Sequence, residues 1–475
     1  MRPKSIYFFS IMIIAAQVSE ASGSINSICE DFSNAFNCCF RVRHHTQNAG
    51  NVNQTLPSSY TEVKRLLNIS SEFTDEFEHL CANIANFMKE TITQNSGRDH
   101  EYILDLTLQR FRHEEFMKLR QAIPDYRSYI QNTLYNSSHN IIFETPDTNP
   151  QGGGEVLIFK YGERLTAAIK IYDLGDEDDD IRPLQEIFSW IYVKKIIGPK
   201  IANSICYLPN LQYFFGCDEK IIMILEGASG QSLESICSEY LKVEPVPQPF
   251  KTALKANAVA LAQFHKNTEI NPLNLVQIKV LLQNSYNNSL MYGSFSADPV
   301  TLKQKIIDNL LKLQSKLHLR LQKNLENLSL NRKTCTTHGD AHVGNIFYNP
   351  ENGKVTLIDY ETAFNSFKND GDPFKDIGCF LGSIWFKISA SNQQNAFETG
   401  NEIRLNFILE YLKQIGYFCT YELTEENISR DLDIIDPIKF YMWARMTYSG
   451  ELKDLSEEAK FKLEKMFDED FSGEI

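Results

Sequence analysis

The chain has 475 residues, of which 43% are hydrophobic and 12% aromatic, so it has the composition of a folded protein with a sizeable core rather than that of a disordered one. Its net charge of −14 argues against a nucleic-acid partner, because phosphate backbones are held by clustered Lys and Arg. An acidic surface suits a cationic small molecule, although solubility is the simpler explanation of the charge.

The first 23 residues have the layout of a cleavable signal peptide. Arg2 and Lys4 precede an apolar run at 6–16, and small residues occupy 19–23. The apolar run is too short to span a bilayer as a helix, and no later stretch is long enough. We therefore expect a soluble protein without a stable membrane span, in a secretory-pathway lumen, in a periplasm or outside the cell.

Residues 24–138 are predicted to form a helical, cysteine-containing region without chemistry of its own. Its second part, 100–134, has apolar residues at roughly helical intervals and is interpreted as a brace or cap on the next part of the chain. Disulfides are expected among its cysteines because of the predicted compartment, with a zinc site as the alternative. The cysteines concerned are Cys29, Cys38, Cys39 and Cys81.

The pattern then changes to short strands and, later, to long helices. Residues 139–228 are predicted to form a five-stranded antiparallel lobe, and 229–475 a mainly helical lobe with one hairpin. The predicted strands are 141–144, 155–161, 165–172, 201–207 and 221–225, and the helix 183–197 lies among them. The clearest later helices are 250–265, 300–328, 376–388, 401–415 and 437–448, and the hairpin joins 346–348 to 355–358 through Asn352-Gly353.

A group of polar residues surrounds this hairpin. His338-Gly339-Asp340 is followed by Asn345 before the hairpin and by Asp359 after it. Phosphoryl transfer needs a carboxylate beside the attacking hydroxyl, and an amide oxygen and a second carboxylate on the metal that bridges the phosphates. The order and spacing supply all three, because the hairpin returns the chain and brings Asp359 near Asn345.

Three segments carry a family resemblance, namely HGDAHVGNIF at 338–347, LIDYETA at 357–363 and GDPFKDIG at 371–378. They resemble the aminoglycoside phosphotransferase and choline kinase group of the protein-kinase-like superfamily. The resemblance implies an α+β, protein-kinase-like fold of two lobes, here preceded by the helical region. It also implies that Asp340 is the catalytic base, that Asn345 and Asp359 bind metal, and that Asp376 holds the catalytic loop by accepting backbone hydrogen bonds.

Three nearby residues have less defined roles. The imidazole of His338 titrates near neutral pH, but the resemblance makes it a scaffold residue that shapes the loop. His342 is interpreted as a polar loop residue rather than a metal ligand. Glu361 contacts either metal or substrate, or forms a structural salt bridge.

The sheet-rich lobe is predicted to hold ATP. Lys170, in Ala-Ala-Ile-Lys on the third strand, matches the kinase lysine that meets the α and β phosphates, and Glu186 on the next helix pairs with it. An exposed edge lysine is the alternative. Two further segments are candidates for nucleotide contact. They are Gly152, Gly153 and Gly154, which form either a phosphate loop or a flexible hairpin, and Glu226, Gly227 and Ala228, whose backbone would meet the adenine edge.

These residues together predict an ATP-dependent kinase that uses Mg²⁺ or Mn²⁺ and phosphorylates a hydroxyl of a small molecule. An aminoglycoside-like, choline-like or sugar-like acceptor fits, and an amine-bearing one suits the acidic surface. A protein kinase is an alternative, but the Arg of His-Arg-Asp and an Ala-Pro-Glu segment are missing. The other alternative is a secreted binding protein that keeps the fold without catalysis.

Overall fold

The structure is a computed structural model of the 475-residue chain. It describes residues 71–95, 100–111, 141–144, 154–161, 164–173, 182–201, 204–209, 211–217, 220–268, 275–294, 301–323, 334–360, 371–417, 421–448, 452 and 455–472. The chain divides into two units, Met1–Leu56 and Pro57–Ile475, and every described residue belongs to the second. The predicted signal peptide at 1–23 lies outside the described residues.

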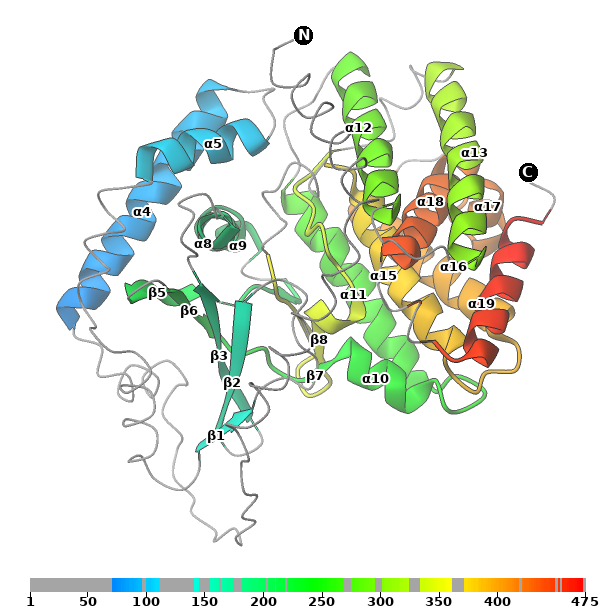
Figure 1. Cartoon of the computed structure of the whole chain (residues 1–475), viewed down its shortest axis with the longest axis horizontal. Coiled ribbons are helices and arrows are strands. Elements are labelled where there is room, and N and C mark those ends of the chain that lie inside the picture. Colours follow the sequence, from blue (N-terminus) through cyan, green and yellow to red (C-terminus); the bar gives the residue numbers. More distant parts are fainter. Residues whose placement is uncertain are drawn as a thin grey trace, which may run out of the picture. The chain divides into compact units, whose positions relative to one another are not determined.

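The larger of two sheets is antiparallel, with the strand order β1-β2-β3-β6-β5 (Figure 1). Its strands are β1 (Ile141–Glu144), β2 (Gly154–Tyr161), β3 (Arg164–Asp173), β5 (Leu211–Cys217) and β6 (Lys220–Glu226). In β3 the alternate residues Ala167, Ile169 and Ile171 are buried, as expected for a strand with one face on the core. Strand alternation therefore directs Lys170 to the opposite face of the sheet.

One predicted strand of this sheet is wrong. Residues 201–207 contain the end of helix α9 (Gly198–Ile201) and the short strand β4 (Cys206–Tyr207), which pairs in parallel with β9 of the other sheet. The place at the sheet edge belongs to β5, which forms a hairpin with β6. A short apolar run carries no information about its partner, so long-range pairing decided which segment joined the sheet.

The smaller sheet contains the predicted hairpin. Its strand order is β4-β9-β8-β7, with β7 (Gln231–Ser232), β8 (Ile346–Asn349) and β9 (Lys354–Leu357). The hairpin prediction is confirmed, because β8 and β9 pair in antiparallel register. Gly353 adopts a positive φ of 68° in the turn, a conformation that glycine adopts without strain. The hairpin returns the chain so that the Ile358 N–H donates to the Asn345 carbonyl at 3.0 Å.

The rest of the described chain is mostly helical. Its helices are α8 (Arg182–Tyr192), the π-helical turn η1 (Val193–Ile197), α9, α10 (Leu233–Tyr240), α11 (Gln248–Asn267), α12 (Leu275–Ser294), α13 (Thr301–Lys323), the 3₁₀ turn η2 (Val343–Asn345), α15 (Pro373–Ser389), α16 (Ala396–Ile415), α17 (Glu425–Arg430), α18 (Leu432–Tyr448) and α19 (Glu457–Asp470). Helices were predicted at 183–197, 250–265, 300–328, 376–388, 401–415 and 437–448, and each lies within or largely overlaps an observed one. Within the described part of the chain, no helix combines the length and apolarity needed to cross a membrane.

Helix α15 packs closely on α18, and this contact fixes the first helix after the hairpin. A Cβ on Gly382 would lie 2.5 Å from the Met442 carbonyl oxygen, so a larger residue would push the helices apart. Asp372 caps the start of α15, since its carboxylate accepts from the Phe374 N–H at 3.1 Å. The same carboxylate accepts from the Tyr441 hydroxyl of α18 at 2.9 Å, so a polar contact reinforces the helix packing.

Two helices precede the sheet, α4 (Ser71–Gln94) and α5 (His100–Phe111), and these are the described parts of the predicted helical region 24–138. One face of α4 is buried at helical spacing, by Phe77, Leu80, Cys81, Ile84, Ala85 and Met88. Full burial of an Ile or Met contributes about 1.5–3 kcal/mol, so this face attaches α4 firmly to the molecule. The Phe87 and Phe111 rings meet edge to face at 5.6 Å and join the two helices.

Cys81 is a free thiol on this buried face rather than half of a disulfide. Burial raises the pKa of Cys81 to about 12, Glu78 adds to the rise, and Lys195 opposes it. The expectation of a disulfide at Cys81 is therefore corrected: the helix turns its side chain into the apolar contact with its neighbours. The other predicted partners, Cys29, Cys38 and Cys39, lie outside the described residues.

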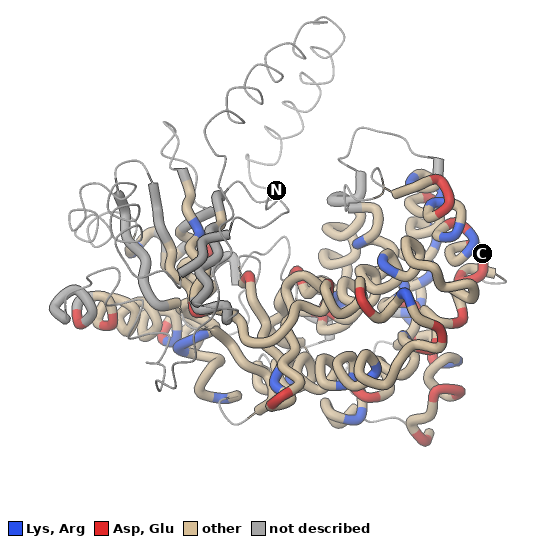
Figure 2. The backbone as a smooth tube through the Cα atoms, turned by 90° about the horizontal axis from the view of Figure 1, so that it is seen from below, with Lys and Arg blue, Asp and Glu red and all other residues tan. Residues whose placement is uncertain are grey.

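Charged residues of both signs are interspersed along the described chain, as Figure 2 shows. Neighbouring charges of opposite sign partly cancel one another's field. The net charge by itself is therefore a weak guide to the charge of a substrate.

Candidate active site

The segment 338–345 forms a short loop ahead of β8. It ends in the turn η2, whose first N–H groups are capped by His342: the Nδ1 atom accepts from the Gly344 N–H at 3.0 Å. The Val343 N–H donates to the Ser383 hydroxyl of α15 at 3.2 Å. These contacts fix the backbone between Asp340 and Asn345, the two residues to which the sequence assigns chemistry.

Asp376 supports the start of this loop from α15. Its buried carboxylate accepts from the N–H groups of His338, at 2.7 Å, and Gly339, at 2.9 Å. Burial alone would raise the pKa of Asp376, but the hydrogen bond and charge of His265 and the loop contacts outweigh it, and the pKa is lowered. His265 lies 2.9 Å from the carboxylate and 2.8 Å from the Tyr411 hydroxyl, so α11 and α16 are joined to the same support.

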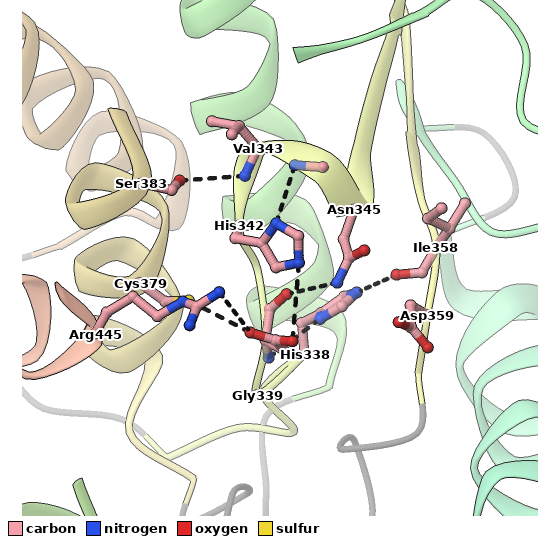
Figure 3. Close-up of polar contacts among 12 residues, drawn as sticks. His338, Gly339, His342, Val343, Asn345, Ile358, Asp359, Cys379, Ser383 and Arg445 are labelled. Carbon is pink, nitrogen blue, oxygen red and sulfur yellow. Dashed lines mark hydrogen bonds and ion pairs between the residues drawn. The ribbon is translucent and has the colours of Figure 1, made fainter. Parts of the chain in front are cut away.

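His338 is fully buried beneath the loop, with both ring nitrogens engaged. Its Nε2 donates to the Ile358 carbonyl at 2.7 Å, and its Nδ1 faces the Asp340 N–H at 3.4 Å. A carbonyl oxygen can only accept a hydrogen bond, so the Nε2 atom of His338 must carry a proton. His338 thus joins the loop to the end of the hairpin, and its proton is committed to a structural contact (Figure 3).

Lys170 lies between two carboxylates. Its Nζ is 2.7 Å from Glu186 Oε1 of α8 and 2.7 Å from Asp359 Oδ1, so three separate segments of the chain meet at this amine. Burial would lower the pKa of Lys170, but the charges of Asp359 and Glu186 outweigh it and raise the pKa. Glu186 also accepts from the Tyr172 hydroxyl and from the Trp190 indole, the latter at 3.2 Å.

Asp359 has an unusual backbone. Among the described residues it is the one non-glycine residue with a positive φ, of 65°. Such conformations persist where the surroundings over-determine them. Burial acts to raise the pKa of Asp359, but its contact with Lys170 outweighs this and lowers the pKa, so the carboxylate is ionised at neutral pH. The charge of Asp340 acts in the opposite direction and favours a higher pKa of Asp359.

Asp340 is bordered by three side chains. Arg445 of α18 brings Nη2 to 3.8 Å from its Oδ1, the Cys379 thiol lies 3.9 Å from the same oxygen, and His342 Nε2 lies 3.9 Å from Oδ2. Figure 3 shows Arg445 and Cys379 on one side of the loop and Asp359 on the other. Burial lowers the pKa of His342 despite the Asp340 charge, so its ring is neutral near pH 7.

Sequence reasoning missed Arg445 altogether. It lies near the end of a helix whose other residues, such as Trp443 and Met446, are buried in the core. An arginine within so apolar a segment was the available signal, because arginine is seldom buried without a partner. Its partner could not be read locally, since Asp340 belongs to a distant segment.

The donor set fits a hard divalent cation. Asn345 donates its Nδ2–H to the Asp340 carbonyl at 3.0 Å, which fixes the amide and leaves Oδ1 as the atom that could bind a cation. Among the described residues no cluster of three or more His, Cys, Asp or Glu side chains could hold a metal. A cation here would therefore depend on one or two protein oxygens and on the phosphates of a substrate, which is how Mg²⁺ is usually bound in such sites.

The remaining predicted residues are only partly within the described chain. Glu226, Gly227 and Ala228 lie at the end of β6 and just beyond it, and the Tyr207 hydroxyl contacts both Glu226 carboxylate oxygens at 2.8 Å. Gly154 begins β2. Gly152, Gly153 and Glu361 lie outside the described residues.

Comparison with known proteins identifies the family. The model of the APH family, described as the phosphotransferase enzyme family, matches residues 166–411, which is more than half of the chain. No curated protein matches the sequence. Two solved structures illustrate the remote likeness. A glucosamine kinase in complex with glucosamine, ADP and inorganic phosphate is 10% identical, covering 72% of this chain and 82% of that one, with a TM-score of 0.38.

The second is WaaP in complex with acyl carrier protein, which is 12% identical, covering 67% of this chain and 92% of that one, with a TM-score of 0.29. At these scores neither structure assigns an activity or a substrate to this chain. The family match stands on its own: it begins within β3 and ends within α16, and it includes both Lys170 and the loop with Asp340. This chain belongs to the phosphotransferase enzyme family.

Proposed function

We propose that this phosphotransferase moves the γ-phosphoryl group of ATP to a hydroxyl group of a small molecule, with Asp340 as the general base. The observation that carries the proposal is the meeting of Lys170, Asp359 and the Asp340–Asn345 loop at the end of one hairpin. Phosphoryl transfer relies on positioning and charge stabilisation rather than on covalent chemistry, and these residues supply both.

The reaction assigned to the site is a single displacement at phosphorus. The acceptor oxygen attacks the γ phosphorus, the bond from that phosphorus to the β–γ bridging oxygen breaks, and ADP leaves. The hydroxyl proton passes to the carboxylate of Asp340. Arg445 and His342 flank that carboxylate and restrict where an acceptor hydroxyl can approach it.

The remaining residues hold the nucleotide. Asn345 and Asp359 would hold Mg²⁺ or Mn²⁺, and a bound divalent ion would neutralise charge on the phosphates. Lys170 contacts the α and β phosphates, directed by Glu186. The backbone of Glu226, Gly227 and Ala228 contacts the adenine edge, and Gly152, Gly153 and Gly154 approach the phosphates.

The acceptor class that we propose is a polyhydroxy or amino alcohol, such as a sugar, an aminoglycoside or choline. We further propose that residues 1–23 direct the chain into a secretory compartment and are removed there. Determination of the mature N-terminus by mass spectrometry tests this second proposal, and a mature chain that retains Met1 or starts at Arg2 contradicts it.

The test of the reaction is ATP turnover with Mg²⁺ against a panel of sugars, aminoglycosides, choline and ethanolamine. Because a general base contributes roughly 10²–10⁴-fold, Asp340→Asn should lower kcat by that factor. Asp308→Asn, on the exposed face of α13, is the matched control and should leave kcat unchanged. Equal turnover by wild type and Asp340→Asn removes the base, and nucleotide binding without turnover of any acceptor favours a non-catalytic binding protein.

A further inference from the structure

Helix α8 supplies Glu186, and the position of this helix decides whether Lys170 is correctly directed. The Glu186 carboxylate is held from three sides, by Lys170, by the Tyr172 hydroxyl and by the Trp190 indole. The Lys170 contact is 2.7 Å long, so a shift of α8 by the width of one atom would break it. Whatever holds α8 in place therefore acts on the nucleotide site.

Helix α8 is buried on every side. Its seven residues 186–192 are all at most 7% exposed, and they extend over about two turns, which covers the whole circumference of the helix. Glu186 and Trp190 lie on the side of Lys170, and Trp190 also meets the Tyr360 ring edge to face at 4.9 Å. Phe188 and Ile191 lie about 200° and 140° around the helix from Glu186, so they face away from the site. That outer side needs a cover.

Helices α4 and α5 are the candidates for this cover among the described residues. Both pack against α8, beside which they lie in Figure 1. Helix α4 also packs against η1. Glu78 of α4 forms a 2.6 Å ion pair with Lys195 of η1. Both helices lie before residue 166, where the family match begins, so the cover is a feature of this chain outside the matched segment.

We propose that α4 and α5 form a built-in brace that sets the position of α8 and thereby of the Lys170–Glu186 pair, so that nucleotide affinity depends on residues of α4. The inference rests on the proposed function, because it assigns Lys170 to nucleotide binding. Within the brace, Ile84 is the positioning residue: it is fully buried at the centre of the apolar face of α4.

The buried face contributes more to the brace than the ion pair does. The side chains of Lys195 and Glu78 are 35% and 52% exposed, and exposed ion pairs contribute little to stability. Burial of the apolar face of α4 is the larger contribution. A charge placed on that face should therefore release α4, whereas reversal of the ion pair should have a small effect.

The experiment compares Ile84→Asp with Ala82→Asp in the full chain. Ala82 is exposed on the opposite side of α4, so the two variants add the same charge to the same helix. Two quantities are measured, the Kd for Mg·ADP by calorimetry and amide hydrogen exchange in α4, α8 and α15. If α8 is correctly placed in about a tenth of the molecules once α4 is released, the Kd of Ile84→Asp should be about tenfold higher than that of wild type.

The exchange pattern separates a brace from general damage. Ile84→Asp should speed exchange in α4 and α8 and leave α15 as in wild type, whereas Ala82→Asp should match wild type in both measurements. Ile84→Leu, which keeps the burial, should restore the wild-type Kd. The proposal is overturned if the α4 amides of Ile84→Asp exchange freely while the protection of α8 and the Kd stay as in wild type.

A second set of variants covers the case in which Ile84→Asp fails to fold. Glu78→Lys and Lys195→Glu should each raise the Kd about twofold, as expected for an exposed pair, and the double variant should restore it. Absence of any such change in Kd or α8 exchange also counts against the brace. If wild type itself binds no Mg·ADP, the proposed function fails, and α8 exchange alone decides whether α4 positions α8.

Discussion

The loop that contains Asp340 and the cluster around Lys170 are adjacent but are held by different kinds of contact. The start of the loop is held by one fully buried carboxylate, Asp376, which accepts from neutral backbone N–H groups. The cluster consists of three charged side chains from β3, α8 and the end of the hairpin, and two of them remain partly exposed, Lys170 at 14% and Asp359 at 29%. The loop is thus a fixed template, while the cluster is within reach of a ligand.

This difference explains how one site can be both rigid and receptive. The contacts of Asp376 are satisfied within the protein, so ligand binding need not disturb them. Lys170 and Asp359 pair with each other, and a triphosphate and a cation can each take one member of that pair. We expect variants of the loop support to lose stability and variants of the cluster to lose nucleotide affinity.

The largest effect should come from Asp376→Asn. The substitution replaces a charged acceptor of two backbone hydrogen bonds with an amide, so the free energy of unfolding should fall by about 3 kcal/mol. Urea denaturation measures the change. Asp308→Asn, exposed on α13, should stay within about 0.5 kcal/mol of wild type. If Asp376→Asn is equally benign, the loop is held by something other than this carboxylate.

A smaller effect, on binding rather than stability, should result from Lys170→Met. Loss of a charge-assisted contact with phosphate should weaken Mg·ADP binding by about 2 kcal/mol, or about 30-fold in Kd. Stability should change less, because Glu186 keeps its contacts with Tyr172 and Trp190. Lys251→Met, which breaks an exposed ion pair with Glu402, is the matched control and should leave the Kd unchanged. An unaltered Kd in Lys170→Met would remove the lysine from the nucleotide site.

The smallest effect should appear in the acid dependence of stability. The pKa of Asp376 is lowered in the folded chain, so the unfolded chain binds its proton first as the pH falls. Its contribution is therefore present above about pH 4 and is lost progressively below it. Urea unfolding between pH 6 and pH 3, compared in wild type and Asp376→Asn, should show the shallower slope in the variant. Parallel curves would mean that this carboxylate is not responsible.

The features that could be predicted from the sequence are local ones. The hairpin of β8 and β9 is indicated by two short runs of β-branched, aromatic and aliphatic residues around a glycine turn, and that hairpin explains the spacing of Asp340, Asn345 and Asp359. Helix α15 is indicated by its Asp-Pro start and its apolar run. In each case the residues that decide the structure lie within a few positions of one another.

The features that were missed depend on distant partners. Residues 201–207 were predicted as a strand of the larger sheet, and β5 was not. The two segments differ in their distant partners, because β5 pairs with β6 whereas β4, within 201–207, pairs with β9. Arg445 reaches Asp340 only through the packing of α18 on α15. The contact of α4 with α8 likewise could not be predicted, because an amphipathic pattern shows which face of a helix is buried but not which element covers it.

Metal-dependent nucleotide binding tests the central claim most directly. Calorimetric titration of ADP into wild type, with and without Mg²⁺, should show binding that strengthens when the metal is present. Asp359→Asn should lose that dependence on metal while keeping the fold, since it removes a charged ligand and retains the side-chain shape. Two results would contradict the assignment of this hairpin as the site of phosphate transfer. One is an ADP affinity that is the same with and without Mg²⁺, and the other is an Asp359→Asn variant whose ADP affinity depends on Mg²⁺ as much as that of wild type.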